Sequence, residues 1–316
     1  MNPKLTYTQD VGGFKRGTGL LVIEVRNSNP NGDPDRDSDP RQRPDQRGEI
    51  SPVSFKRKTR DLVEWKGEVW DALAGDLNLA AARFDILESR GRDNRPTIAK
   101  QLTGDGSAFI NKYWDARVFG NTFLESMKEK EAKEKHNFSD KEIDEFKKNA
   151  IRTGCVHFGL GLSVAPIDIE RHTNTNKVGV QDDKDRGMAP MGYRFVPHGL
   201  YLMPFFVNPS AAARTGCTGE DIALLLELIR YAYPHTRSHA RPAVDLARAW
   251  YVEHSDKLGS CSDFAILDAL SPTKLADPDM PSKSIAEYLL PNALPAELAD
   301  KKDRHGNPAL TLIDLL

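Results

Sequence analysis

Apolar and polar residues alternate with a period of two along the stretch 156–164. Val156, Phe158 and Leu160 are separated by glycine or polar residues, which predicts a β-strand. The second face of this strand carries mostly glycine and serine, so another backbone or a ligand is expected to approach it closely. Runs rich in apolar and β-branched residues predict three more strands: 19–26, 199–207 and 245–252. Pro204 lies inside one of these runs and predicts an edge strand or a bulge, because proline has no N–H for the ladder.

A helix is predicted to begin at Ser51 and Pro52, with serine as the cap and proline in the first turn. At about 100° per residue, one side of this helix collects four residues: Phe55, Thr59, Leu62 and Val63. Lys56, Arg57 and Arg60 fall on an adjacent arc, so the helix should bury one side and expose basic groups beside it.

Two other regions show helical signals. Thr218 caps a strongly apolar segment that continues to Tyr233. The segment 125–148 is almost entirely charged and contains Ser139 and Glu142 at capping-box spacing. We interpret this charged segment as a solvated helical hairpin.

With these insertions removed, the predicted order is strand, helix, strand, strand, helix, strand. That order predicts an α+β fold of the RNA-recognition or ferredoxin-like βαββαβ type. Two helices on one face of such a sheet would leave the other face free for single-stranded RNA.

Composition narrows the possible classes of protein. The chain has 316 residues, of which 39% are hydrophobic and 28% charged, with a formal net charge of −2. This is ordinary globular composition, and the near-neutral charge means that any nucleic-acid binding must come from a local patch. Cys155, Cys217 and Cys261 are far apart and odd in number, which excludes a disulfide framework and fits a reducing cytoplasm. No apolar run approaches a membrane span and no secretory signal is recognisable, so we expect a cytoplasmic protein without membrane contact.

Possible metal ligands and catalytic motifs match their patterns poorly. The acidic series Asp33 to Asp39 suggests a calcium loop, but Ser38 and Pro44 occupy the positions where glycine and glutamate are required. His235 and His239 stand four apart, without the glutamate of the zincin pattern. The glycines of 159–163 match neither a nucleophile elbow nor a dinucleotide loop. The residues therefore predict no bound metal, no cofactor and no catalytic centre.

Basic residues concentrate at the junction between the first strand and the first helix. Between positions 41 and 60 there are two acidic residues and seven basic ones: Arg41, Arg43, Arg47, Lys56, Arg57, Lys58 and Arg60. Such a run is either a solvated helix face or a phosphate-binding patch. The serine-capped helix start adds free backbone N–H groups, which also bind phosphate.

Several separated segments resemble one protein family. The strand end and loop at 27–35 and the segment 47–61 look like the CRISPR-associated backbone subunit of type I Cascade complexes, Cas family seven, in its type I-C and I-B branch. Segments 115–120 and 191–201 resemble further patterns of that family. The resemblance covers about the first 250 residues in the right order.

The resemblance implies a hand-shaped subunit. An RNA-recognition-like palm would comprise 19–65 and 151–255, with helical fingers at 66–150. A protruding thumb at 167–198 would be inserted in the palm, and 256–316 would form a C-terminal extension.

The resemblance also implies a site on the guide RNA. Ser51, Lys56 and Arg60 would contact guide phosphates, and Met188 or Met191 would be the apolar wedge between bases. The complete set of RNA-binding residues expected on this basis is as follows: Asn31, Ser51, Lys56, Arg57, Arg60, Arg171 and Met188.

The implied function is non-catalytic. Copies of the subunit would polymerise along the spacer of the crRNA guide and hold its bases exposed, so that base pairing reads the target DNA. The implied partners are crRNA, target DNA, further copies of itself, the subunit that caps the guide 5′ handle, the large PAM-reading subunit and a recruited helicase-nuclease.

Two enzymatic alternatives remain at this stage. Related type III backbone subunits cleave RNA with an aspartate in the loop after the first strand, where this chain has Asp33. A metal-dependent hydrolase built on Asp33 to Asp39 with His235 and His239 would be the interpretation without the resemblance.

Overall fold

A computed structural model describes residues 8–91, 94–121, 129–151, 153–175 and 190–316. The described residues form one eight-stranded antiparallel sheet, with a central path in the order β10-β7-β1-β6-β4-β2. Strands β3 and β5 each pair with β6. The strand bounds are β1 (Gly17–Ser28), β2 (Arg47–Ile50), β3 (Val156–Phe158), β4 (Gly161–Pro166), β5 (Glu170–Thr175), β6 (Pro190–Val207), β7 (Val244–His254) and β10 (Leu310–Asp314). A separate short pair consists of β8 (Thr273–Lys274) and β9 (Tyr288–Leu289). The fold is therefore α+β with an antiparallel sheet.

Helices connect these strands. The α-helices are α1 (Pro52–Glu64), α2 (Glu68–Asp76), α3 (Arg95–Gln101), α4 (Ser107–Lys112), α5 (Trp114–Phe119), α6 (Glu129–His136), α7 (Asp140–Asn149), α8 (Ala212–Thr215), α9 (Gly219–Tyr231), α10 (Asp263–Leu270) and α11 (Ala296–Ala299). Short 3₁₀ turns are η1 (Pro34–Arg36), η2 (Ala81–Arg83), η3 (Pro209–Ala211), η4 (Pro234–Thr236) and η5 (Ile285–Glu287). Three of the four predicted strands and the helices that begin at Ser51 and Thr218 are present, whereas the predicted strand 156–164 is divided into β3 and β4. The predicted capping box at Ser139 and Glu142 is confirmed. Among the described residues, no helix is long and apolar enough to cross a membrane.

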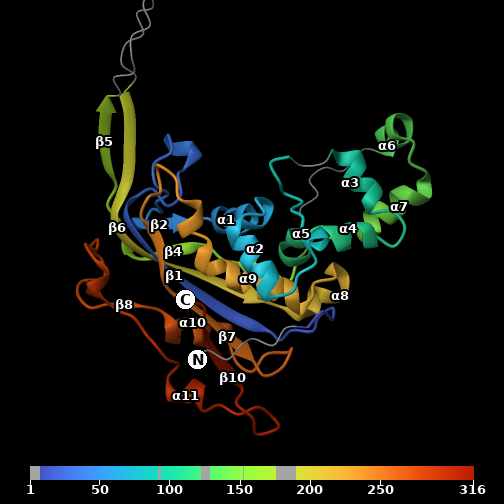
Figure 1. Cartoon of the computed structure of the whole chain (residues 1–316). Helices are drawn as coiled ribbons and strands as arrows, with labels where there is room; N and C mark the ends of the chain where they lie inside the picture. Colours follow the sequence, from blue (N-terminus) through green and yellow to red (C-terminus); the bar gives the residue numbers. More distant parts are fainter. Residues whose placement is uncertain (1–7, 92–93, 122–128, 152, 176–189) are drawn as a thin grey trace, which may run out of the picture.

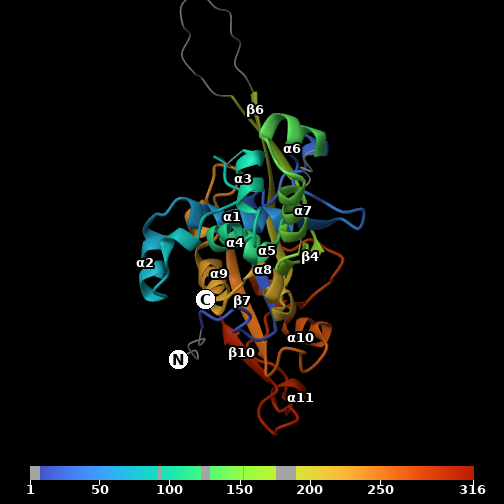
Figure 2. The same cartoon turned by 90° about the vertical axis from the view of Figure 1, so that its right-hand side faces the viewer.

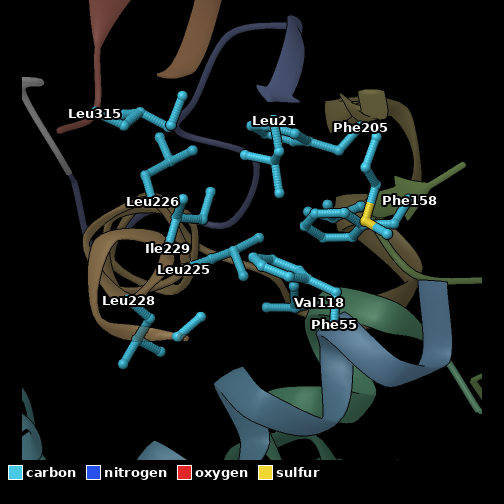
Figure 3. Packing of buried hydrophobic residues seen from close by; sticks show 14 of the residues in the cluster. Leu21, Phe55, Val118, Phe158, Phe205, Leu225, Leu226, Leu228, Ile229 and Leu315 are labelled. Carbon is cyan, nitrogen blue, oxygen red and sulfur yellow. The ribbon is translucent and has the colours of Figure 1, made fainter. Parts of the chain in front are cut away.

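Helices α1 and α9 cover one face of the sheet. Alternate residues of β1, such as Leu21, point to this face and pack against Phe55 of α1 and Leu225 of α9. Figure 3 shows this apolar layer, with Phe158 and Phe205 closing it from the neighbouring strands. The predicted buried side of α1 is confirmed, because its four residues are each at most 4% exposed.

The opposite face of the sheet is also covered, contrary to the expectation that it would be open to RNA. Leu20 and Val22 of β1 and Trp250 of β7 pack against Ile266 of α10 and Tyr288 of β9. In Figure 1 the C-terminal residues, in orange and red, lie on the side of the sheet away from α1 and α9. The apolar residues of this C-terminal part come from short elements, among them α10 and β9, and they belong to the core of the protein. Single-stranded RNA therefore has no access to these apolar positions.

Pro204 lies in a central strand, so the predicted edge position is wrong. Its strand β6 pairs with β1 on one side, where Pro204 stands opposite Leu20. On the other side, the predicted strand 156–164 is split into β3 and β4, and the break at Gly159 and Leu160 falls beside Pro204. The N–H of Gly159 donates to the Pro204 carbonyl at 2.8 Å, while the missing proline N–H faces the break. A side chain at Gly159 would meet the Pro204 ring at 2.8 Å, which explains one glycine of the bare strand face.

Two parts extend from the sheet. Helices α3, α4, α6 and α7 form a lobe with small apolar clusters of its own, one of which includes Ile98, Leu102 and Phe109. Helices α2 and α5 instead pack on the main core, through residues such as Trp70 and Val118. Strand β6 continues past the sheet edge and pairs with β5, so that the two strands project as a hairpin in both views (Figures 1 and 2). The start of α1 and the loop after β1 lie at the base of this hairpin (Figure 1).

Candidate nucleic-acid interface

The N-terminus of α1 is joined to the loop after β1 by hydrogen bonds. The Ser51 hydroxyl accepts from the Ser54 N–H at 3.3 Å, and the Ser51 N–H donates to Asn31 Oδ1 at 2.7 Å. Pro52 has no N–H, so the Val53 N–H is the donor left in the first turn. The structure thus brings together Asn31 and Ser51, but it leaves fewer free backbone donors than the sequence suggested.

Of the three basic residues on the predicted arc of α1, Lys56 is the one without a carboxylate partner among the described residues. Its side chain is half-buried, and the ammonium lies 5.3 Å from the centre of the Phe119 ring. Burial and then the charge of Arg60 lower the pKa of Lys56. A phosphate placed here would supply the missing counter-charge. Lys56 is therefore the side chain of α1 best prepared for an anion.

Arg57 and Arg60 are both neutralised within the chain. Arg57 donates to Asp61 at 2.7 Å and to Glu64 at 2.5 Å. Arg60 is 9% exposed and donates to the buried Asp115 at 2.8 Å. The basic arc predicted from the sequence is thus reduced to Lys56, because acids from α1 itself and from α5 compensate its neighbours.

Lys58 belongs to the basic cluster of the sequence but was not among the expected RNA-binding residues, and the structure shows it as a buried cation of α1. It is 7% exposed, donates to Thr236 Oγ1 at 2.9 Å and lies 5.1 Å from the centre of the Tyr233 ring. Burial and the charge of Arg241 lower its pKa to about 8. The turn at 234–241 is thereby tied to α1, and Arg241 holds the end of β1 by donating to the Asn29 carbonyl at 3.0 Å.

Two of the expected RNA-binding residues belong to the segment 167–198. Arg171 lies on β5, and its guanidinium is bonded to Asp39 of the loop after β1. Met188 lies outside the described residues.

The loop aspartates serve the fold of the loop and the hairpin. The Asp33 carboxylate accepts from the Asp35 N–H at 3.2 Å and caps η1. Asp37 and Asp39 pair with the arginines of the hairpin: both contact Arg194, and Asp39 also contacts Arg171.

The candidate histidines contact aromatic rings. The ring of His235 lies 5.7 Å from Tyr231, and that of His239 lies 5.4 Å from Tyr193. Within the described part of the chain, no group of three or more His, Cys, Asp or Glu side chains could hold a metal ion.

The segment 115–120 joins α1, α5 and α9 through two ion pairs. Asp115 binds Arg60 and also accepts from the Leu87 N–H at 2.7 Å. Arg117 and Asp221 form a fully buried pair at 2.7 and 2.9 Å. Losing one member of such a pair costs about 3–5 kcal/mol, because an uncompensated charge stays buried. The Arg60–Asp115 pair fixes α1, and with it Lys56, against α5, and the Arg117–Asp221 pair fixes α5 against α9. No spacing rule in the sequence could have predicted partners that are more than fifty residues apart.

This geometry defines an α+β protein with a cationic strand–loop–helix junction beside a projecting hairpin. A model of the family described as CRISPR-associated protein Cas7 matches residues 15–291, so the chain belongs to that family. A search of curated proteins finds no match.

Solved structures provide weaker similarities. One is a chain from a structure titled "CRISPR RNA-guided surveillance complex", with 15% identity, a TM-score of 0.43, and coverage of 81% of this chain and 76% of the other. Another, titled "CRISPR RNA-guided surveillance complex, pre-nicking", has 14% identity, a TM-score of 0.39 and coverage of 75% and 76%. Membership of the Cas7 family therefore rests on the family match over residues 15–291.

Proposed function

We propose that this protein is the non-catalytic, guide-RNA-binding backbone subunit of a CRISPR Cascade surveillance complex. Membership of the Cas7 family carries the proposal, and the cationic junction at the start of α1 agrees with it. Copies of the chain would assemble along the crRNA spacer and present its bases to target DNA. The subunit that caps the 5′ handle, the PAM-reading subunit and a recruited helicase-nuclease would be its other partners.

The division into parts follows the same proposal. Strands β1, β4, β6 and β7 with α1 and α9 would be the RNA-recognition-like palm, and their order in the chain and in the sheet supports this. Residues 66–150 would be the fingers, the hairpin within 167–198 the thumb, and 256–316 an extension that covers the second sheet face. RNA would then run over the α1 junction, since the apolar positions of that second face are occupied.

The direct contacts in this proposal are Asn31, Ser51 and Lys56. Arg57 and Arg60 are proposed to shape the junction around them, because their charges are already balanced by Asp61, Glu64 and Asp115. The wedge role of Met188 stays a proposal taken from the family resemblance.

A single preparation tests both binding and the absence of cleavage. The purified protein is expected to carry a discrete RNA of guide length, visible in its absorbance ratio and on a gel. When this complex is incubated with complementary RNA and Mg²⁺, both strands should stay intact, and Asp33→Ala should behave in the same way. Capping of η1 by the Asp33 carboxylate is the observation that favours this outcome over the ribonuclease alternative.

Two results would overturn the proposal. Protein that is free of RNA and fails to bind a guide-length RNA would remove the binding role. Regularly spaced products that disappear with Asp33→Ala would identify a ribonuclease of the type III kind.

A further inference from the structure

The base of the β5–β6 hairpin contains two cross-strand neighbours of like charge. Arg171 on β5 stands directly opposite Arg194 on β6. Like charges at such a position repel and weaken strand pairing. Some counter-charge is therefore needed for the hairpin to keep this register.

Asp39 provides that counter-charge from outside the hairpin. It is 9% exposed, and its Oδ1 lies 3.3 Å from Arg171 Nε and 3.1 Å from Arg194 Nε. The other carboxylate oxygen also bonds Arg171, and Asp37 adds a bond to Arg194. The hydrogen bond from Arg171 is the main reason that the pKa of Asp39 is lowered, so the carboxylate is charged throughout the neutral range.

The loop that carries Asp39 also carries the residues that meet α1. Asn31 accepts from the Ser51 N–H, and the Asn31 carbonyl accepts from the Arg41 N–H at 2.9 Å. A second tie comes from the turn at 234–241, where the Tyr193 hydroxyl donates to the His239 carbonyl at 2.9 Å. The hairpin base and the α1 junction are therefore parts of one hydrogen-bonded unit.

We propose that Asp39 is a positioning residue that sets the hairpin relative to the α1 junction, and that Arg171 affects RNA binding through Asp39 instead of touching phosphate. This inference rests on the proposed function for the RNA that the two parts would share. Competition between RNA and Asp39 for the arginines is disfavoured, since a phosphate that took them would leave a buried carboxylate without its partners.

The first measurement needs no RNA. Asp39→Asn removes the charge and keeps the shape, whereas Asp35→Asn changes an exposed carboxylate of the same loop that has no ion pair among the described residues. We expect amide hydrogen exchange in 170–175 and 192–195 to become about tenfold faster in Asp39→Asn and to stay unchanged in Asp35→Asn. Unchanged exchange in Asp39→Asn would overturn the positioning role.

The second measurement is a double-mutant cycle with a synthetic single-stranded RNA of guide length. Asp39→Asn should weaken binding about tenfold with the same salt dependence, and Arg171→Gln should add no further loss in the Asp39→Asn background. If Arg171 touched phosphate, Arg171→Gln would weaken binding further in that background and reduce the salt slope by about 0.7. Tighter RNA binding by Asp39→Asn would show instead that RNA and Asp39 compete for the two arginines.

The two measurements separate this inference from the proposed function. Wild-type protein that binds no RNA would contradict the proposed function and the RNA part of this inference. The exchange result would still decide whether Asp39 holds the hairpin.

Discussion

At the scale of single residues, charge balance separates the basic side chains of α1. Arg57 and Arg60 have carboxylate partners, whereas Lys56 has none among the described residues and lies beside Phe119. A charge without a partner gains most from an incoming anion, so Lys56 should contribute more to RNA affinity than its neighbours can.

Lys56→Ala should weaken binding of single-stranded RNA and reduce the dependence of log K on log salt by about 0.7, the value for one phosphate contact. Lys148→Ala, which changes an exposed lysine of α7, serves as the matched control and should alter neither quantity. Titrations at several salt concentrations measure both. Equal slopes for Lys56→Ala and wild type would mean that Lys56 is a solvated helix residue. Arg60→Glu is unsuitable for this purpose, since it would leave Asp115 buried beside a second negative charge.

At the scale of elements, a buried polar chain fixes α10 to the sheet. His254 of β7 contacts the Thr18 hydroxyl of β1 at 3.2 Å, and that hydroxyl donates to Asp263 of α10 at 2.5 Å. The Ser260 N–H donates to His254 Nδ1 at 3.0 Å, so this nitrogen must be unprotonated. The neutral ring is thus part of the contact between the C-terminal residues and the sheet.

This contact predicts a dependence of stability on pH. Burial is the main cause that lowers the pKa of His254 below its ordinary value of 6.5, opposed by Asp263 and Asp256 and reinforced by Arg16. Just below pH 6.5 the unfolded chain takes up a proton that the folded protein does not. Stability is therefore full above this pH and falls as pH decreases toward the lowered pKa of His254.

Denaturant midpoints measured at several pH values should fall less steeply on acidification in His254→Gln than in wild type. His305→Gln, at an exposed loop position, should keep the wild-type slope. An unchanged slope in His254→Gln would contradict this account, although part of the slope remains because the pKa values of His157 and His198 are also lowered.

At the scale of the whole molecule, the arrangement of parts bears on assembly. The hairpin projects from one side, and the lobe of α3, α4, α6 and α7 extends to another (Figures 1 and 2). If the hairpin of one copy meets a different surface of the next copy, the contact is heterologous and does not close into a dimer.

The protein mixed with guide-length RNA should therefore form graded or long oligomers. Sedimentation or light scattering, with and without RNA, measures this. The expected distribution shifts to larger species as RNA length increases. A single two-fold dimer that ignores RNA would contradict head-to-tail assembly.

The sequence by itself determined the local elements. The alternation at 156–164, the Ser51–Pro52 helix start and the capping box at Ser139 depend on neighbouring residues, so they could be predicted from spacing alone. The motif segments also indicated the family, because they preserve residue types in a fixed order. The sequence also located the basic cluster at the start of α1, but it did not show which of these basic side chains lack a carboxylate partner among the described residues.

Only the tertiary structure decided how these elements are used. The acids that balance Arg60 and Arg171 come from distant segments, and the central place of Pro204 depends on a break in a neighbouring strand. The C-terminal residues cover the second sheet face with apolar side chains from several short, separate elements, among them α10 and β9. The neutralisation of these charges and the covering of the second sheet face depend on contacts between residues far apart in the chain. A local sequence pattern carries no information about such contacts.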